Sequence, residues 1–394
     1  MSAPLYHCGI DAEPLHRYQP GGYHPLGLGD FLKAGRYQVL HKLGWGGYST
    51  TWAAKDHKKD RYVAVKIIVS ETKHKRELEV LRAMSALPRH HPGWSHVNQM
   101  LDSFTLAGPN GTHDCLVLEL LGPSVADIVE LYCKDDRLSA SLAKSFASQA
   151  MQGLDFLACH NIGHGDIHTR NLAITVPGLE SLDEKGFFER FGSPYASPVT
   201  RLDGECLMSN VPSHIVQPAS SRMKDILLSS PTIKVIDFGE AFFKDSVPDT
   251  LHTPLSVRAP EVIFGDPFDC RVDMWSAGCL LFELVTGQPP FDVTMITPPL
   301  LVQQMMEFAT DGLPPRWQGK WQAMQEGLSH SDEEDTYTLQ GWLEEVYFDD
   351  CKHSDFTRDD IAKVGKLIER LLKFEPSLRA TASDVLADAW FEQG

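Results

Sequence analysis

Three polar side chains in two short segments carry the chemistry that this sequence suggests. Asp166 and Asn171 lie five positions apart in a polar stretch after a long apolar helical pattern, and Asp237 follows the strand-like residues 235–236. Phosphoryl transfer needs a group that orients a hydroxyl and oxygen ligands that hold Mg²⁺ on the phosphates. Asp166 suits the first role, and Asn171 and Asp237 suit the second. The sequence therefore predicts a phosphotransferase site.

A glycine-rich stretch between two strand patterns adds a place for phosphates. Residues 44–49 fit Gly-x-Gly-x-x-Gly, with Ser49 at the third glycine position. Glycines let the backbone come close to phosphates and expose N–H donors. A strand pattern follows this stretch, whereas a helix follows the dinucleotide-binding fingerprint. A plain hairpin turn is the alternative interpretation.

Lys66 lies in an apolar strand pattern, where an ammonium group without a partner would be costly to bury. Glu77 and Glu79 are the candidate partners in the next predicted helix. Glu77 is favoured because Leu78 and Leu81 set the inward face of that helix. A Lys–Glu pair would leave Lys66 aimed at phosphate oxygens. An edge strand with an outward lysine is the alternative.

The segments around these residues divide the chain into a β-rich part and a helical part. Residues 1–36 are rich in Gly, Pro, His and Tyr and predict an irregular extension, and the proline-rich residues 177–231 predict a loop-rich insert. A period of two favours strands and a period of 3.6 favours helices. Strands are expected over 37–40, 49–52, 62–68 and 116–118, and helices over 74–84, 142–159, 272–286, 361–374 and 382–388.

The composition is that of a folded acidic protein. The chain has 394 residues and a formal net charge of −17, so a basic nucleic-acid-binding face is not expected. The eight cysteines form no Cys-x-x-Cys pair, which argues against a zinc site or a redox dithiol. No signal peptide is seen, nor an apolar run of about 18 residues. We expect a monomer of the cytoplasm, the nucleus or both, without membrane or direct nucleic-acid partners.

These features occur in the order of the protein-kinase motifs. Residues 237–239 are Asp-Phe-Gly, and residues 259–261 are Ala-Pro-Glu. The chain therefore resembles a eukaryotic-type protein kinase over about residues 37–392. The resemblance implies an α+β, bilobal fold with a small β-rich N-lobe over residues 37–121. A larger α-helical C-lobe, residues 122–394, would carry the insert.

The resemblance also implies a role for each candidate residue. Asp166 would accept the proton of the substrate hydroxyl, and Asn171 and Asp237 would hold Mg²⁺. Lys66 and Glu77 would form the ion pair beside the phosphates of ATP.

A structural pair and a nucleotide site are implied as well. Glu261 would pair with Arg379. ATP and Mg²⁺ are the implied cofactors. The positions that would contact the nucleotide are Leu43, Gly44, Gly46, Gly47, Ser49, Thr51, Ala64, Lys66, Leu118, Glu119 and Leu121.

The resemblance narrows to one group of kinases. Residues 21–25, Gly-Gly-Tyr-His-Pro, and residues 42–46, Lys-Leu-Gly-Trp-Gly, resemble the SR-protein-specific serine/threonine kinases. Those kinases carry an insert before the Asp-x-Gly strand, and here Asn171 and Asp237 lie 66 positions apart. The implied reaction transfers the γ-phosphate of ATP to Ser or Thr of protein substrates. Basic or Arg/Ser-rich splicing factors are one substrate class.

Those kinases dock Arg-Ser tracts in an acidic groove, and this sequence has few of the acidic residues expected for that groove. Residues 292–302 are mostly apolar where several acids would be expected. Glu307 and the acidic residues 332–335 offer a substitute.

The catalytic segment departs from the family pattern at two positions. Gly165 replaces an arginine that usually pairs with a phosphorylated activation loop, which leads to the hypothesis of activity without such phosphorylation. His168 replaces a lysine that neutralises the γ-phosphate. Arg170 lies four residues after Asp166, where tyrosine kinases place a substitute arginine. We expect Arg170 to restore the charge.

Two other classes of function compete with an active protein kinase. One is a pseudokinase scaffold that binds partners without turnover. The other is a small-molecule phosphotransferase, because His-Gly-Asp-x-His-x-x-Asn also resembles the aminoglycoside and choline kinases. Glu261 and Arg379 argue against the second class, which is not expected to carry the Ala-Pro-Glu segment.

Overall fold

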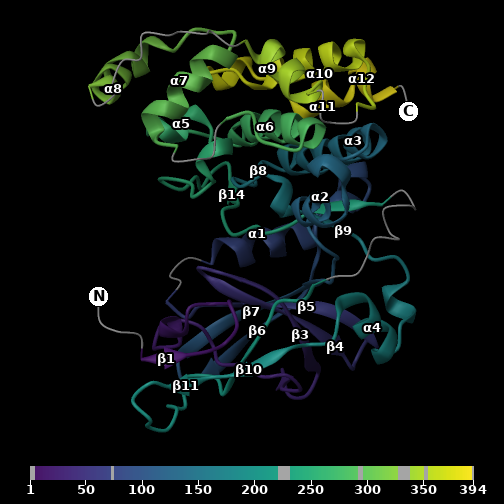
Figure 1. Cartoon of the computed structure of the whole chain (residues 1–394), viewed down its shortest axis with the longest axis vertical. Helices are drawn as coiled ribbons and strands as arrows, with labels where there is room; N and C mark the ends of the chain where they lie inside the picture. The colour runs from purple at the N-terminus through teal and green to yellow at the C-terminus, as the bar shows by residue number, and fades with distance from the viewer. Residues whose placement is uncertain are drawn as a thin grey trace. The chain divides into compact units, whose positions relative to one another are not determined.

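The chain folds into a β-rich unit and a helical unit (Figure 1). The structure, a computed structural model, describes residues 5–71, 75–220, 231–291, 296–326, 338–349 and 354–392. The first unit combines Met1–Ser85, Asn98–Gly122 and Thr175–Pro231, and the second combines Ala86–Val97, Pro123–Ile174 and Thr232–Gly394. This division confirms the expected α+β class with two lobes.

A six-stranded antiparallel sheet forms the body of the first unit, with strand order β2-β3-β4-β5-β7-β6. Strand β5 therefore has a neighbour on each side, and the edge-strand alternative for Lys66 is wrong. The strands are β2 (Phe31–Leu32), β3 (Tyr37–Gly46), β4 (Ser49–Asp56), β5 (Arg61–Ile68), β6 (Met100–Gly108) and β7 (Gly111–Glu119).

The two faces of this sheet differ because side chains alternate along each strand. Val63, Val65 and Val117 belong to a buried apolar cluster on one face. Ala64 and Lys66 therefore point to the opposite face. Helix α1 (Arg76–Ser85) buries Leu78, Val80, Leu81 and Met84.

The insert packs with the first unit, whereas the sequence placed it in the C-terminal lobe. Strand β11 (Thr200–Arg201) of the insert pairs with β1 (Tyr6–His7) of the extension, and β10 (Ala196–Pro198) pairs with β12 (His214–Val216). Helix α4 (Glu184–Phe191) stacks Phe187 on Tyr62 of β5. These contacts join residues far apart in the chain, which explains why local composition did not reveal them.

Helices dominate the second unit. Helix α6 (Val272–Thr286) is almost entirely buried and ends at Gly287, whose φ of 83° suits a residue without a side chain. The predicted range of this helix is confirmed. The others are α2 (Val125–Tyr132), α3 (Ala140–Cys159), α5 (Pro260–Ile263), α7 (Pro298–Phe308), α8 (Pro315–Gln325), α9 (Leu339–Tyr347), α10 (Arg358–Leu371), α11 (Ala382–Leu386) and α12 (Ala389–Glu392).

Two small strand pairs in the second unit fix the polar segments of interest. Strand β9 (Leu172–Ile174) pairs with β13 (Ile233–Val235), and β8 (Ile162–Gly163) pairs with β14 (Phe242–Phe243). Asp166 and Asn171 therefore lie between β8 and β9, and Asp237 lies between β13 and β14. No helix among the described residues is both long enough and apolar enough to span a bilayer.

Candidate active site

The backbone of the segment that carries Asp166 is hydrogen-bonded to the buried start of helix α6. The two oxygens of the Asp273 carboxylate accept the backbone N–H groups of His164 and Gly165, at 2.7 and 2.8 Å. Burial raises the pKa of Asp273 to about 7, and these two hydrogen bonds oppose that rise. Sequence reasoning placed Asp273 in the helix expected over residues 272–286 but missed this function. An acid at the first turn of an apolar helix was the available signal.

Gly165 has a structural reason to be glycine. Its φ is +78°, and a Cβ atom there would lie 2.9 Å from the carbonyl oxygen of Glu240. The Gly165 carbonyl accepts a hydrogen bond from the hydroxyl of Thr253, at 2.5 Å. The backbone of the catalytic segment is therefore in direct contact with residues 240–253.

His164 is fully buried. Its Nδ1 accepts the Asp166 N–H at 3.2 Å, and its Nε2 lies 3.0 Å from the Ile236 carbonyl oxygen. The ring proton therefore sits on Nε2. Burial lowers the pKa of this imidazole. His164 thus joins the segments of Asp166 and Asp237 as a neutral group.

The two oxygens of Asp166 differ. Oδ2 accepts a hydrogen bond from the Asn171 amide at 2.9 Å, and the same amide donates to the Asp166 carbonyl at 2.8 Å. Oδ1 is buried without a hydrogen-bond partner among the described residues. Both N–H bonds of Asn171 thus face Asp166, which leaves the amide oxygen of Asn171 directed elsewhere.

Asp237 follows strand β13 in the left-handed backbone conformation, with φ of 59°. Such a φ is uncommon for residues other than glycine and recurs at functional sites. Its Oδ1 lies 3.3 Å from the Gly239 N–H.

His168 and Arg170 lie in different surroundings. His168 Nε2 is 3.5 Å from Asp166 Oδ1, whereas Arg170 Nη1 is 3.8 Å from Asp127 Oδ1 of helix α2. The Arg170 side chain is 66% exposed and lines a cavity that also contains Glu130 and Glu283. The structure therefore does not bring Arg170 to Asp166. Counting residues from Asp166 could not show that the short turn at 169–171 directs the guanidinium toward α2.

The ion pair of the first unit has the geometry that its sequence predicted. Lys66 Nζ lies 2.6 Å from Glu77 Oε1, and each side chain is 11% exposed. Glu79 is exposed on helix α1. Glu77 is thus the partner, because the inward face of the helix carries it toward strand β5.

The predicted nucleotide positions cluster on the same sheet. Thr51 is the cross-strand partner of Lys66, and Leu118 is the partner of Ala64. Leu43 to Ser49 form the end of β3, a two-residue turn and the start of β4. Glu119 ends β7, Leu121 follows it, and a Glu119 carboxylate oxygen accepts the Gln99 N–H at 3.2 Å.

Glu261 and Arg379 form the pair expected from the sequence. Two guanidinium nitrogens each lie 2.6 Å from a Glu261 oxygen, and the side chains are 1% and 0% exposed. Arg379 also donates to the carbonyls of Lys373 and Arg271. The bidentate geometry fixes the start of helix α5 to the segment after α10.

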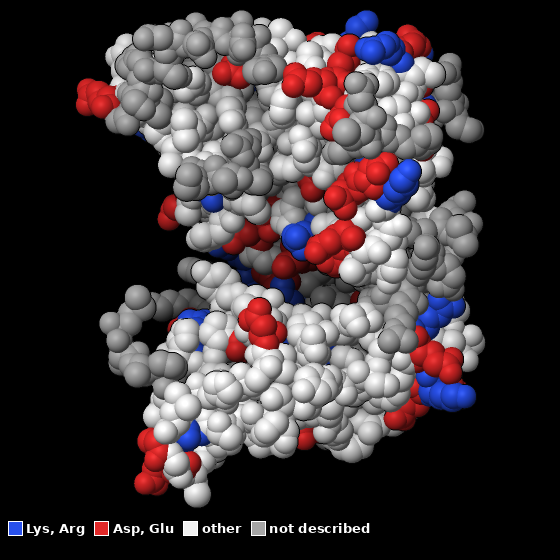
Figure 2. Space-filling view, viewed as in Figure 1, with Lys and Arg blue, Asp and Glu red and all other residues white. Residues whose placement is uncertain are grey.

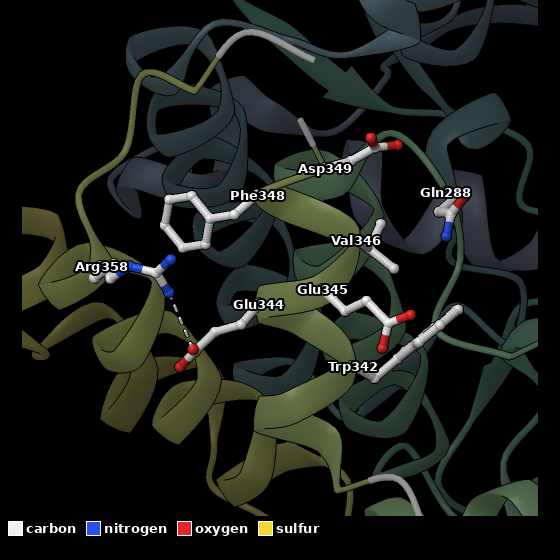
Figure 3. Close-up of a pocket in the computed structure, with 8 residues that line it drawn as sticks. All are labelled: Gln288, Trp342, Glu344, Glu345, Val346, Phe348, Asp349 and Arg358. Atoms are coloured by element: carbon white, nitrogen blue, oxygen red, sulfur yellow. Dashed lines mark hydrogen bonds and ion pairs between the residues drawn. The ribbon is translucent and has the colours of Figure 1, made fainter. Parts of the chain in front are cut away.

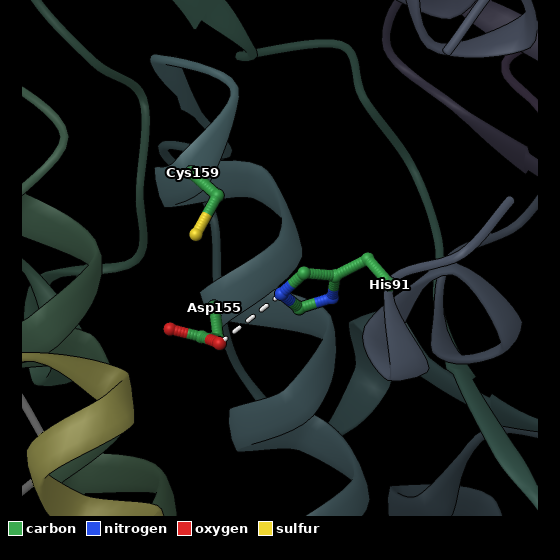
Figure 4. A group of neighbouring side chains, drawn as sticks. All are labelled: His91, Asp155 and Cys159. Carbon is green, nitrogen blue, oxygen red and sulfur yellow. Dashed lines mark ion pairs between the residues drawn. The ribbon is translucent and has the colours of Figure 1, made fainter. Parts of the chain in front are cut away.

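One other cluster has the residue types of a metal site. His91, Asp155 and Cys159 place their ligand atoms within 4.8 Å of one another (Figure 4). However, His91 Nδ1 accepts the Gly93 N–H, so the ring proton sits on Nε2, 3.2 Å from Asp155. Desolvation, and to a smaller extent the charge of Asp155, raises the pKa of the Cys159 thiol. The close contact between His91 and Asp155 explains this group without a metal.

A cavity of about 670 Å³ opens beside helix α9. Its lining includes three acids, of which Glu344 lies beside Arg358 at 3.5 Å. Glu345 and Asp349 point to the opposite side of the helix, toward Gln288 (Figure 3). The acidic run 332–335 and residues 292–295 of the expected docking region lie outside the described residues.

The chain belongs to the protein kinase family. The family model described as "Protein kinase domain" matches residues 37–179 and 222–391, which leaves most of the insert unmatched. A crystal structure of a kinase domain matches with a TM-score of 0.65 and 20% identity, over 94% of this chain and 98% of that chain, and it supports the fold.

Its sequence relatives include serine/threonine kinases of the SR-protein kinase type. The serine/threonine-protein kinase SRPK of Physarum polycephalum is 29% identical over 405 residues, which cover 95% of this chain and 90% of that protein. SRSF protein kinase 3 of Homo sapiens is 34% identical over 164 residues, which cover 40% of this chain and 29% of that protein.

Proposed function

We propose that this protein is an active kinase that transfers the γ-phosphate of ATP, with Mg²⁺, to serine or threonine of protein substrates. The observation that carries the proposal is the state of Asp166. One carboxylate oxygen is held by Asn171, and the other is buried without a hydrogen-bond partner among the described residues. His168 Nε2 approaches this second oxygen at 3.5 Å without a hydrogen bond. A buried carboxylate oxygen without a hydrogen bond is costly, and such groups persist where they serve a reaction.

The glycine-rich loop supports the nucleotide part of the proposal. A Cβ atom at Gly44, Gly46 or Gly47 would meet nothing within 4 Å, and none of the three has a positive φ. Neither packing within the protein nor backbone conformation therefore requires glycine at these positions. Close approach of a phosphate would require it.

The oxygen groups of the second unit fit Mg²⁺, which prefers carboxylate and amide oxygens. Asn171 and Asp237 are the residues that would hold it. Mg²⁺ bound to ATP neutralises charge that develops on the phosphates. Asp166 would orient the substrate hydroxyl and take its proton at Oδ1. Lys66, oriented by Glu77, would bind phosphate oxygens.

A single substitution tests the proposal. Asp166→Asn should lower the rate of ³²P transfer from Mg-ATP to a basic protein by about a thousandfold, because the amide cannot accept the proton. Asp359→Asn, on the exposed side of α10 beside Lys363, is the matched control and should leave the rate unchanged. Nucleotide binding without transfer by the wild-type protein would identify a pseudokinase scaffold. Transfer to choline or aminoglycosides alone would identify a small-molecule kinase.

We extend the proposal to basic substrates, including Arg/Ser-rich ones. The name of the human relative refers to SRSF proteins. The α9 cavity offers Glu345 and Asp349 on the side of the helix that also carries the ring of Trp342. Acids beside aromatic faces suit guanidinium groups. Acidic side chains are also more abundant than basic ones on the face seen in Figure 2.

A charge reversal in this cavity tests the substrate class. Glu345→Lys should raise the KM for an Arg-Ser repeat peptide about fivefold, with kcat unchanged, because the cavity is a docking position and not part of the chemistry. Glu189→Lys, an equal charge change on the exposed surface of α4, is the control. Equal KM values for the two variants would exclude the cavity as a docking site.

The same proposal places the protein in the cytoplasm, the nucleus or both, as a monomer. The seven cysteines of the described segments are free thiols, which suits a reducing compartment.

A further inference from the structure

Two side chains of the N-terminal extension hold the tip of the glycine-rich loop. The Arg17 guanidinium donates a hydrogen bond to the Gly47 carbonyl oxygen at 3.0 Å. The Tyr23 hydroxyl donates to the Gly46 carbonyl oxygen at 2.8 Å. Two consecutive peptide groups at the turn between β3 and β4 are thus tied to a segment that precedes the kinase motifs. We call Arg17 and Tyr23 the loop clamp.

The clamp residues are themselves fixed. Arg17 lies 2.9 Å from the Glu71 carboxylate and 5.5 Å from the centre of the Tyr23 ring. Gly21 has a φ of +94°, and a Cβ atom on Gly22 would lie 1.8 Å from the Arg17 carbonyl oxygen. Only a Gly-Gly pair allows this tight turn, which presents the Tyr23 hydroxyl to the loop. The motif at residues 21–25 therefore has a physical explanation in this structure.

The insert supports the extension from its other side. Asn210 of the insert donates to the Tyr18 carbonyl at 2.8 Å. Asn110, which is 1% exposed, donates to the carbonyls of Tyr23 and Asn210, at 2.7 and 2.9 Å. Residues of the extension and the insert share one buried cluster that contains Tyr18, Tyr23, Val69, Val199, Val211 and Ile215.

The clamp determines where the loop directs its N–H groups. In a planar trans peptide the C=O and the following N–H point in opposite directions. Holding the Gly46 and Gly47 carbonyls therefore directs the N–H groups of Gly47 and Tyr48 away from the extension. Glycine-rich segments lose much conformational entropy when they become ordered. A loop that is ordered before a ligand arrives binds that ligand more tightly.

We infer that Arg17 and Tyr23 are positioning residues that preorganise the glycine-rich loop for a nucleotide phosphate, and that the insert maintains them in place. This inference rests on the proposed function, because the ligand of the loop is the ATP of that proposal. It assigns a role to the extension and the insert, which lie largely outside the matched kinase domain.

Tyr23→Phe is the sharpest test, because it removes one hydroxyl and keeps the buried ring. The dissociation constant for Mg-ATP should rise about fivefold, because a change of that size corresponds to the loss of one hydrogen bond. The kcat at saturating ATP should change less than about twofold. Arg17→Ala combined with Tyr23→Phe should raise the constant further. Replacing Arg17 by lysine instead of alanine keeps the charge, so Arg17→Lys should bind Mg-ATP more tightly than Arg17→Ala does.

Tyr62→Phe is the matched control. The Tyr62 hydroxyl also donates to a backbone carbonyl of the first unit, that of Leu182 at 3.2 Å, but away from the loop. Amide hydrogen exchange without nucleotide provides a second measurement. Residues 44–49 should exchange faster in Tyr23→Phe than in Tyr62→Phe, at equal melting temperatures.

The outcomes separate the inference from the proposed function. Equal ATP affinity and equal exchange in Tyr23→Phe and Tyr62→Phe would overturn the inference while the kinase assignment stands. Faster exchange of residues 44–49 without a change in ATP affinity would also overturn the inference, because the ordering of the loop would then not contribute to nucleotide binding. Absence of ATP binding by the wild-type protein would overturn the proposed function, and with it the role of the clamp in binding.

Discussion

At the scale of single residues, the structure separates His168 and Arg170, the two side chains that the sequence offered beside Asp166. His168 Nε2 lies 3.5 Å from Asp166 Oδ1, and Arg170 is directed toward Asp127. We therefore expect His168→Ala to lower kcat about tenfold and Arg170→Ala to lower it less than about twofold, because only the imidazole borders the reacting oxygen. This order reverses the expectation from the sequence. Steady-state kinetics at saturating Mg-ATP would decide, and a larger loss in Arg170→Ala would contradict the assignment.

Asp273 gives a second prediction at this scale. Burial raises its folded-state pKa to about 7, above the value of about 3.9 in an unfolded chain. Between these values the native state binds more protons than the unfolded state, so this group's contribution to stability falls as pH rises. From pH 5 to pH 7 the contribution should fall by about 2 to 3 kcal/mol.

Denaturant unfolding of wild type and Asp273→Asn at several pH values measures this contribution. The difference in free energy of unfolding between the two proteins should shrink steadily over that range, since the amide does not titrate. A constant difference would show that the two N–H donors from His164 and Gly165 keep the carboxylate ionised. In either case Asp273→Asn should lower kcat, because an amide offers only one acceptor to two donors.

At the scale of elements, the periodicity of apolar residues predicted the features that depend on residues close together in the chain. The apolar helix over 272–286 and the pair of Glu77 with Lys66 follow from helical periodicity, and both are present. The place of the insert did not follow from composition, because its strand β11 pairs with residues almost two hundred positions away. The position of Arg170 depends on a single 3-10 turn, over Thr169–Asn171, whose direction no periodicity encodes.

The activation segment, residues 237–261 between the Asp-Phe-Gly and Ala-Pro-Glu motifs, gives a prediction at the same scale. The Glu240 carboxylate accepts hydrogen bonds from the N–H and ring of His252, both at 3.0 Å, and Thr253 bonds to Gly165. These contacts fix the segment without a phosphate, and Gly165 offers no charge to one. Treatment with a broad-specificity phosphatase should therefore leave kcat and the KM for peptide unchanged. Loss of most activity, restored by autophosphorylation, would refute this expectation.

At the scale of the whole molecule, the net charge of −17 makes the attraction of a substrate depend on the charge of that substrate. An acidic protein attracts basic peptides over distances of about a Debye length, which shrinks from about 10 Å at 0.1 M salt to about 3 Å at 1 M. We expect kcat/KM for an Arg-rich serine peptide to fall about tenfold between about 0.05 and 0.5 M NaCl. A serine peptide of zero net charge is the control and should change less than about twofold. Equal salt dependence of the two peptides would show that the acidic surface serves solubility, and the proposed preference for basic substrates would then rest on the α9 cavity alone.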